Sequence, residues 1–192
     1  MARVKEFDEK EVLGKALEIF WSKGYNGTSM QDLIDGLGIS RSSLYDTYGD
    51  KRALFLSVLD HYRQTQSEAM ISMIEESTDI RQTLRDMLYQ TLLLCPADKA
   101  KYGCFMVNTT IELAPHDEEI NEMIARNQKD VEQAIYKAIQ KGQQKGQVTK
   151  QHSAKTLAKF ILNTLTGLRV NVKSHTDKKA ITEIIEVALS VL

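Results

Sequence analysis

The chain has 192 residues, 42% of them hydrophobic and 27% charged, with a formal net charge of −1, a composition typical of a globular protein with one large or two small domains. It contains no apolar run of the roughly 18 residues that span a bilayer and no signal-peptide core, and its two cysteines are too few for a disulfide framework. We therefore expect a cytoplasmic protein without membrane contact. The two prolines and many Leu, Ile, Lys, Glu and Gln residues predict an all-α fold, and the helical segments along the chain number about nine.

The first predicted helix covers residues 7–24. Its apolar residues recur with helical spacing, and they are Val12, Leu13, Ala16, Leu17, Ile19 and Phe20. Gly24 is a suitable C-cap because glycine tolerates the geometry of a helix end. We interpret this segment as an amphipathic helix that holds a small N-terminal domain together.

Residues 28–52 contain two short helices and the start of a third. The first has an apolar stripe at i, i+3, i+4 and i+7, formed by Met30, Leu33, Ile34 and Leu37. Gly36 and Gly38 then surround a break, and Ser40 is a natural N-cap for the second short helix. This layout is typical of a helix-turn-helix, whose second helix presents its N-terminal residues to the DNA major groove.

The charge of the N-terminal region is nearly balanced, which is unusual for a nucleic-acid binder. Five of its eight cations nevertheless lie before the first helix and around the second short helix, at Arg3, Lys5, Arg41, Lys51 and Arg52. Such a local cluster predicts modest DNA affinity with appreciable salt sensitivity.

A larger helical region is expected to follow. Asp50 is the predicted cap of a long helix, residues 51–76, which connects a domain of residues 1–50 to one of residues 51–192. Proline or glycine ends several of the later helices, which are expected at residues 80–94, 103–114, 116–145, 153–174 and 178–192.

Residues 10–56 carry a further pattern: a helix ending in F-x-x-x-G-Y, a helix with a Thr at its start, a G-I-S turn, a Leu-Tyr pair, another aromatic residue and a lysine. The matching residues are Phe20, Gly24, Tyr25, Thr28, Gly38, Ile39, Ser40, Leu44, Tyr45, Tyr48 and Lys51. The pattern resembles the DNA-binding domain of the TetR family of bacterial transcriptional regulators. The resemblance implies a dimeric, sequence-specific DNA-binding regulator of a palindromic operator, most often a repressor released by a small-molecule effector.

The same resemblance implies phosphate contacts from Thr28, Tyr45, Tyr48 and Lys51. Hydroxyl and ammonium groups near helix N-termini can position a duplex in this way. Tyr48 also fits core packing with its hydroxyl at the surface, and both interpretations stay open.

The candidate base readers are Arg41, Ser42 and Ser43, because arginine can bind guanine O6 and N7 while serine is permissive. Arg41 also suits a phosphate contact, and Ser40 suits a helix cap better than a base contact. Asp46 stands where such proteins often carry His or a basic residue. Its carboxylate would either repel phosphate or accept a hydrogen bond from a cytosine amino group.

The C-terminal part resembles the ligand-binding and dimerisation domain of the family more loosely, through Gly103-Cys104, Asn108, Glu112-Leu113 and Gly167-Leu168. The candidate effector-binding residues combine flexible, aromatic and polar side chains, and they are Met70, Met87, Tyr89, Phe105, Asn108 and Glu112. The methionines also suit simple core filling, and Asn108 also suits a structural hydrogen bond.

The last two predicted helices carry an excess of apolar residues. Two such helices from each of two copies would form a four-helix dimer interface, with candidates Phe160, Ile161, Leu165, Leu168, Ile184 and Ala188. A monomer that buries these residues internally is the alternative.

Other chemistry has little support in the sequence. Cys104 is either a buried inert thiol or a redox-active one, and its pairing with Cys95 stays open. The histidines lack metal-ligand spacing, and they are His61, His116, His152 and His175. We predict no metal, no cofactor and no enzymatic activity; an enzyme and a helical interaction module that does not bind DNA are the rival classes.

Overall fold

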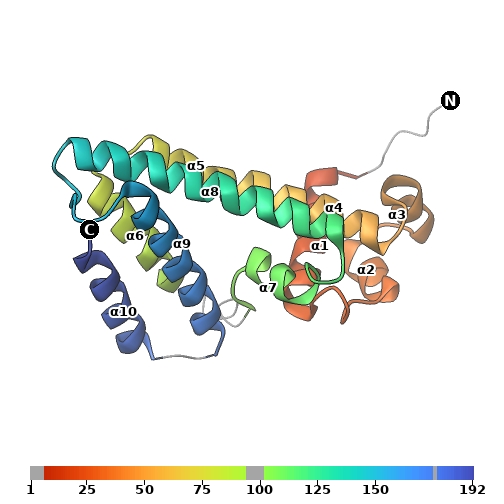
Figure 1. The fold of residues 1–192 in the computed structure, drawn as a ribbon. Helices are drawn as coiled ribbons and strands as arrows, with labels where there is room; N and C mark the ends of the chain where they lie inside the picture. Colours follow the sequence, from red (N-terminus) through yellow and green to blue (C-terminus); the bar gives the residue numbers. More distant parts are fainter. Residues whose placement is uncertain (1–6, 94–101, 175–176) are drawn as a thin grey trace.

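The computed structural model describes residues 7–93, 102–174 and 177–192, which contain helices and no strand (Figure 1). Its elements are α1 (Glu9–Lys23), α2 (Met30–Leu37), α3 (Arg41–Tyr48), α4 (Lys51–Tyr62), the π-helical η1 (Arg63–Ser67), α5 (Glu68–Glu75), α6 (Ile80–Leu93), α7 (Phe105–Glu112), α8 (Glu118–Gln144), α9 (Ala154–Asn171), the 3₁₀ turn η3 (Val172–Ser174) and α10 (Lys178–Ser190). Because η1 joins α4 and α5 into one rod, the described residues contain the nine helices predicted, and the all-α class is confirmed.

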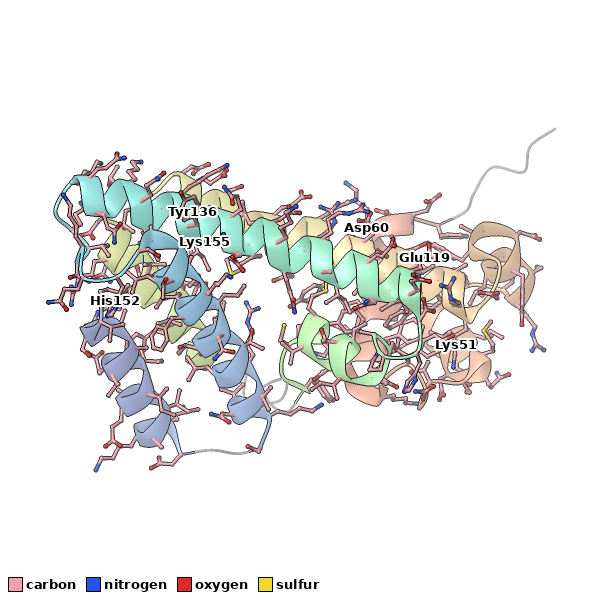
Figure 2. All side chains as sticks on the ribbon, viewed as in Figure 1. Lys51, Asp60, Glu119, Tyr136, His152 and Lys155 are labelled. Carbon is pink, nitrogen blue, oxygen red and sulfur yellow. The ribbon has the colours of Figure 1, made fainter. Side chains whose placement is uncertain are left out.

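The rod α4–η1–α5 and the helix α8 run side by side along the molecule (Figure 1). With 27 residues, α8 is about 40 Å long at 1.5 Å per residue. Helices α1, α2 and α3 pack at one end of this pair, and α6, α9 and α10 pack at the other. Figure 2 shows Lys51 and Glu119 at the first end, and Tyr136 and His152 at the opposite one.

Side-chain caps define the first four helices. Asp8, Ser40 and Asp50 each accept a backbone N–H of the helix they precede, as short polar residues do at N-caps. The cap of α2 is Ser29, which forms a reciprocal capping box with Asp32. The predicted cap positions of α3 and α4 are therefore confirmed, and α1 begins two residues later than expected.

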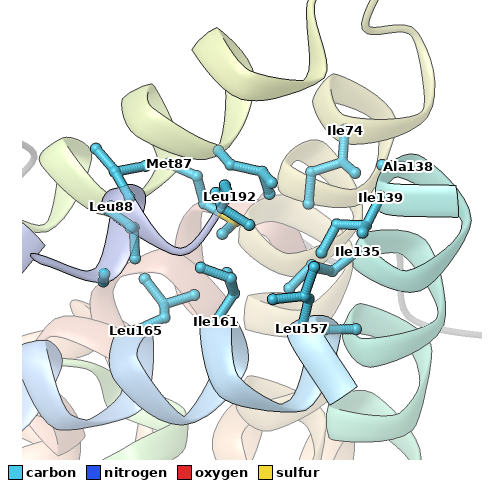
Figure 3. Packing of buried hydrophobic residues seen from close by; sticks show 14 of the residues in the cluster. Ile74, Met87, Leu88, Ile135, Ala138, Ile139, Leu157, Ile161, Leu165 and Leu192 are labelled. Carbon is cyan, nitrogen blue, oxygen red and sulfur yellow. The ribbon is translucent and has the colours of Figure 1, made fainter. Parts of the chain in front are cut away.

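Two hydrophobic clusters form the core. One lies among α5, α6, α8, α9 and α10, and Figure 3 shows its centre. The other contains the buried residues of α1 to α4, and it also takes in Phe105 and Leu113 around α7 and Ile120 on α8. The expected boundary between residues 50 and 51 therefore does not coincide with a division of the core, because α7 and the start of α8 pack with the N-terminal helices.

Some predictions fall outside the described residues. They concern the cations Arg3 and Lys5, the thiol of Cys95 and the histidine His175.

Candidate DNA-binding surface and effector cavity

The outer surface of α3 holds four of the nine residues predicted to contact DNA. Leu44 is fully buried and fixes the helix against the core, so Arg41, Ser42, Tyr45 and Asp46 are left exposed. The guanidinium of Arg41 lies 6.0 Å from the centre of the Tyr45 ring, within the range of a cation–π contact. The helix thus presents one arginine, one phenol hydroxyl, serine hydroxyls and one carboxylate on a solvent-facing side.

The turn between α2 and α3 has the geometry of a helix-turn-helix. Gly38 adopts the left-handed conformation, with φ 69° and ψ 24°, which favours glycine. The side chain of Ser40 accepts the backbone N–H of Ser43 at 3.1 Å, so Ser40 acts as the cap of α3. Gly36 lies inside α2 rather than at the break. A Cβ atom added at Gly36 would be 2.6 Å from the Ile19 side chain.

Two residues predicted to bind phosphate, Thr28 and Lys51, have hydrogen-bond partners within the protein. The Thr28 side chain is buried, and its hydroxyl donates to the Gly24 carbonyl at 2.6 Å. The Lys51 ammonium donates to the carbonyls of Tyr25 and Thr28 at 3.0 and 2.9 Å. It also lies 4.2 Å from the centre of the Tyr25 ring. Both side chains therefore hold the α1–α2 loop in place. The burial of Thr28 is a correction to its expected position at the DNA surface, whereas a phosphate contact from the half-exposed Lys51 stays a prediction.

Tyr48 points inward. Its hydroxyl is buried and has no hydrogen-bond partner among the described residues. Burial raises the pKa of Tyr48, and the nearby charge of Glu9 raises it further. This position fits core packing of the Tyr48 ring. Both the phosphate contact and the core-packing interpretation placed the hydroxyl at the surface, however, and it is buried.

A cavity of about 400 Å³ lies between the two ends of the molecule. Its wall is mostly apolar and flexible, with four methionines, Met70, Met73, Met87 and Met106. Trp21 of α1 also lines it, and the Trp21 indole N–H donates to the Gly103 carbonyl at 3.0 Å. The volume lies within the usual range of small-molecule sites.

The π-helical turn η1 forms part of the same wall. Gln66 and Ser67 belong to η1 and line the cavity. A π-helical turn holds an extra residue per turn and occurs frequently at functional sites. Here it changes the phase of the rod between α4 and α5.

The predicted effector-binding residues divide into two groups. Met70 and Met87 line the cavity. Tyr89 lies outside it, and its hydroxyl donates to the Glu186 carboxylate at 2.7 Å. Phe105 belongs to an aromatic cluster in which its ring lies 5.6 Å from that of Phe55, and it lines a neighbouring cavity of about 350 Å³.

Asn108 and Glu112 line this second cavity and make structural hydrogen bonds. Asn108 donates to the Tyr102 carbonyl at 2.7 Å, and its side-chain oxygen accepts from Lys173 at 3.1 Å. The Glu112 carboxylate accepts the backbone N–H groups of Tyr25 and Asn26 at 3.1 and 2.8 Å. Glu112 therefore ties the end of α7 to the α1–α2 loop.

A second tie joins α4 to the start of α8. Arg52 donates to Asp117 at 2.8 and 2.9 Å, and to Glu119 at 2.7 Å. The Arg52 guanidinium holds the pKa of the Asp117 carboxyl below its usual value, and the backbone N–H of Ile120 lowers it further.

The predicted dimer residues lie on two sides of α9 and α10. Phe160 and Ile184 are 42% and 41% exposed. Ile161, Leu165, Leu168 and Ala188 are buried in the core of the protomer itself, and Figure 3 shows Ile161 and Leu165 inside that cluster. These four are a correction, because a side chain used in its own core offers no surface to a partner.

Comparison with known proteins addresses this arrangement directly. Residues 12–58 match the bacterial regulatory proteins of the tetR family, and residues 80–188 match a tetracyclin repressor-like C-terminal domain. The chain belongs to the TetR family. It is an HTH-type transcriptional regulator and not an enzyme.

This TetR-family chain is 35% identical over 194 residues to an uncharacterized HTH-type transcriptional regulator of Bacillus subtilis, YezE, and the match covers 100% of each chain. It is 25% identical to the transcriptional repressor ComR of Escherichia coli, over 95% of this chain and 87% of ComR. A mutant of the TetR regulator CifR, solved with operator DNA, superposes with a TM-score of 0.84 at 24% identity, covering 98% of both chains. At that identity the likeness shows the fold alone.

Most residues of the TetR-family cavity wall were not among the predicted effector-binding residues, and two of them, Trp21 and Arg169, matter most for its chemistry. Trp21 lies next to Phe20 on α1, and no local pattern shows that α7 folds back against it. Arg169 also lines the cavity. A signal for it was present, because Arg169 is the one charged residue in residues 160–172.

No described helix of this TetR-family regulator is both long and apolar enough to cross a membrane.

Proposed function

We propose that this regulator is a homodimeric repressor that binds a palindromic operator and leaves it when a small molecule fills the methionine-lined cavity. The observation that carries the proposal is the presence of Trp21 in the cavity wall. Trp21 belongs to α1, the helix against which α2 packs. A ligand in the cavity therefore contacts the DNA-binding part of the protein.

Such a ligand would act by shifting a population. It favours one position of α1 and the rod over another only by its differential affinity for the two states. The ties made by Glu112 and Arg52 then carry the change to the α1–α2 loop and to α4. The relative ComR is a transcriptional repressor, which supports repression rather than activation by this protein.

On this proposal, residues 1–50 bind DNA and residues 51–192 bind the effector and form the dimer. Two copies of α3 would enter successive major grooves about 34–36 Å apart. Arg41, Ser42 and Ser43 would read bases, and Tyr45 would contact phosphate. Asp46 would accept from a cytosine amino group rather than face a phosphate.

DNA from upstream of the gene tests the first half of the proposal. Arg41→Ala is expected to weaken binding to this DNA roughly 10- to 100-fold at fixed salt, as measured by fluorescence anisotropy. Arg126→Ala, an exposed arginine on α8, is the matched control and should keep the affinity of the unaltered protein. Unchanged affinity of Arg41→Ala would contradict base reading by α3.

The second half of the proposal, ligand-induced release, is tested by measuring operator affinity in the presence of cavity ligands. Compounds that bind the cavity should lower operator affinity at saturation. If no cavity-binding compound changes that affinity, ligand release is wrong even where DNA binding holds.

A further inference from the structure

We propose that the cavity binds an organic acid: a ligand with one carboxylate-type anionic head on an apolar body, whose head is held by Arg169. This inference deepens the proposed function, since the bound acid would be the effector. It concerns the chemistry of the ligand and rests on the charges and partners of the cavity wall.

Arg169 is the one charged residue among the described residues that line the cavity. No carboxylate is among them, so nothing in the described wall opposes a negative ligand. A lone cation against an apolar wall gives the cavity a positive potential, because charges interact more strongly where water is scarce.

The guanidinium of Arg169 has no ion-pair partner among the described residues. Its one hydrogen-bond acceptor there is the Met70 sulfur at 3.6 Å, and a thioether is a weak acceptor. By contrast, Arg52, Arg63 and Arg85 each bind at least one carboxylate at 2.7–3.0 Å. Arg169 therefore keeps donors for a group that the protein does not supply.

A carboxylate matches those donors. The guanidinium carries five N–H donors in a planar fork, which suits bidentate binding of a carboxylate. A partly buried charge is costly unless it is paired, so pairing with an anionic ligand would offset the cost of burying the Arg169 guanidinium.

Two of the other polar groups of the wall already have hydrogen-bond partners. The hydroxyls of Thr110 and Thr166 already donate to the carbonyls of Met106 and Leu162 in their own helices, at 2.8 and 2.9 Å. The methionines are adaptable and provide contact without direction. Affinity for the body of the ligand would therefore come from apolar area, and selection for charge from Arg169.

The beginning of α7 adds to the same potential. Gly103 and Cys104 line the cavity, and Cys104 is the N-cap of α7 but makes no side-chain capping bond. The positive end of the helix dipole thus lies at the cavity wall. The backbone of Arg169 lies next to this helix start, because the Arg169 carbonyl oxygen would be 3.2 Å from a Cβ atom added at Gly103.

The test uses two pairs of probes that differ in the head alone: octanoate with octanol, and phenylbutanoate with phenylbutanol. Trp21 is the single tryptophan of the chain and lines the cavity, so its emission reports occupancy. The full-length protein should bind each acid at least about tenfold more tightly than the matched alcohol, as expected for a hydrogen-bonded charge.

Three variants locate the preference. Arg169→Met should weaken both acids roughly 10- to 100-fold and leave the alcohols unchanged, which also shows that the cavity remains folded. Arg169→Lys should retain part of the preference, because it keeps the charge but loses the fork. Arg126→Met, at an exposed site on α8, should behave as the unaltered protein.

The proposal is overturned if the alcohols bind as tightly as the acids, if Arg169→Met leaves acid affinity unchanged, or if neither acid binds at millimolar concentration. Operator release is measured separately by anisotropy. Acids that bind through Arg169 but do not release DNA would contradict the proposed function and leave this inference standing. Release of DNA by neutral compounds alone would support the proposed function and contradict this inference.

Discussion

Two tyrosines of α3 have opposite environments, although they are only three residues apart. Tyr45 is 43% exposed, whereas the Tyr48 hydroxyl is buried without a described partner. An unpaired buried hydroxyl costs free energy, and an exposed one is available to a ligand. The side that each residue occupies on α3, rather than its residue type, therefore decides its role.

This contrast gives a matched pair of variants. Tyr45→Phe is expected to weaken operator binding roughly 2- to 10-fold, the value of one hydrogen bond, without changing stability. Tyr48→Phe should leave operator affinity unchanged and keep or raise the free energy of unfolding by up to about 1 kcal/mol. Anisotropy and denaturant unfolding measure the two effects. If Tyr48→Phe loses more DNA affinity than Tyr45→Phe, Tyr48 contacts phosphate despite the burial of its hydroxyl.

Glu112 gives a second prediction for a single residue. Its carboxylate accepts two backbone N–H groups of the α1–α2 loop, and a glutamine has only one oxygen with which to accept them. Glu112→Gln should lower the free energy of unfolding by about 1 kcal/mol, measured in urea. Because the side chain is partly exposed and its charge is screened by solvent, this value lies below the range of about 1.5–3 kcal/mol for hydrogen bonds to charged groups. Glu122→Gln, an exposed change on α8, should have no effect, and equal losses in both variants would refute the tie.

At the scale of elements, two long helices connect the ends of the molecule, and polar contacts fix their ends. Asp117 caps α8 and also binds Arg52 of α4. It therefore couples the first turn of α8 to the rod that follows the helix-turn-helix. The π-helical turn η1 lies farther along that rod and forms part of the cavity wall.

The Asp117 tie predicts a dependence of stability on pH. Because the folded chain lowers the pKa of Asp117 below its usual value of about 3.9, the group adds stability at pH values above about 4. That stability disappears as the pH falls through the folded pKa. The difference in Tm between the unaltered protein and Asp117→Asn should be constant near neutrality and shrink in acid. Asparagine keeps the helix cap, so a pH-independent difference would assign the effect to something other than this charge.

At the scale of the whole molecule, the exposed apolar residues of α9 and α10 predict how two copies meet. Phe160 and Val170 on α9, and Ile184 and Val187 on α10, are between 41% and 67% exposed. A surface of this kind on neighbouring helices favours an isologous helical interface. We therefore predict that the outward sides of α9 and α10 form the interface of the proposed dimer.

Charge placed on that surface should separate the dimer. Phe160→Glu and Ile184→Glu are each expected to give a monomer in light scattering at micromolar concentration, with weaker operator binding because only one half-site is held. Ile111→Glu changes an apolar residue that is 68% exposed on α7, and should remain dimeric. A dimer that persists in both α9 and α10 variants would place the interface elsewhere.

The helical class, the helix-turn-helix and most helix boundaries can be predicted from the amino-acid sequence alone. These depend on local information: apolar spacing, short polar caps such as Ser40, and Gly38 in its left-handed turn. The TetR pattern in residues 10–56 depends on the same local spacing. Met70 and Met87, two of the predicted effector-binding residues, line the cavity, and their contact with an effector stays a prediction.

The direction in which each side chain points, and the residues that it contacts, depend on the tertiary structure. Thr28 and Lys51 carry the chemistry of phosphate contacts, yet their partners are carbonyls of the folded α1–α2 loop. Ile161 and Ile184 are both apolar, yet one lies in the core and the other faces solvent. Trp21 and Arg169, far apart in the chain, share a cavity wall. Such contacts depend on how helices distant in sequence pack together, and helical spacing specifies the side of a helix without specifying its neighbour.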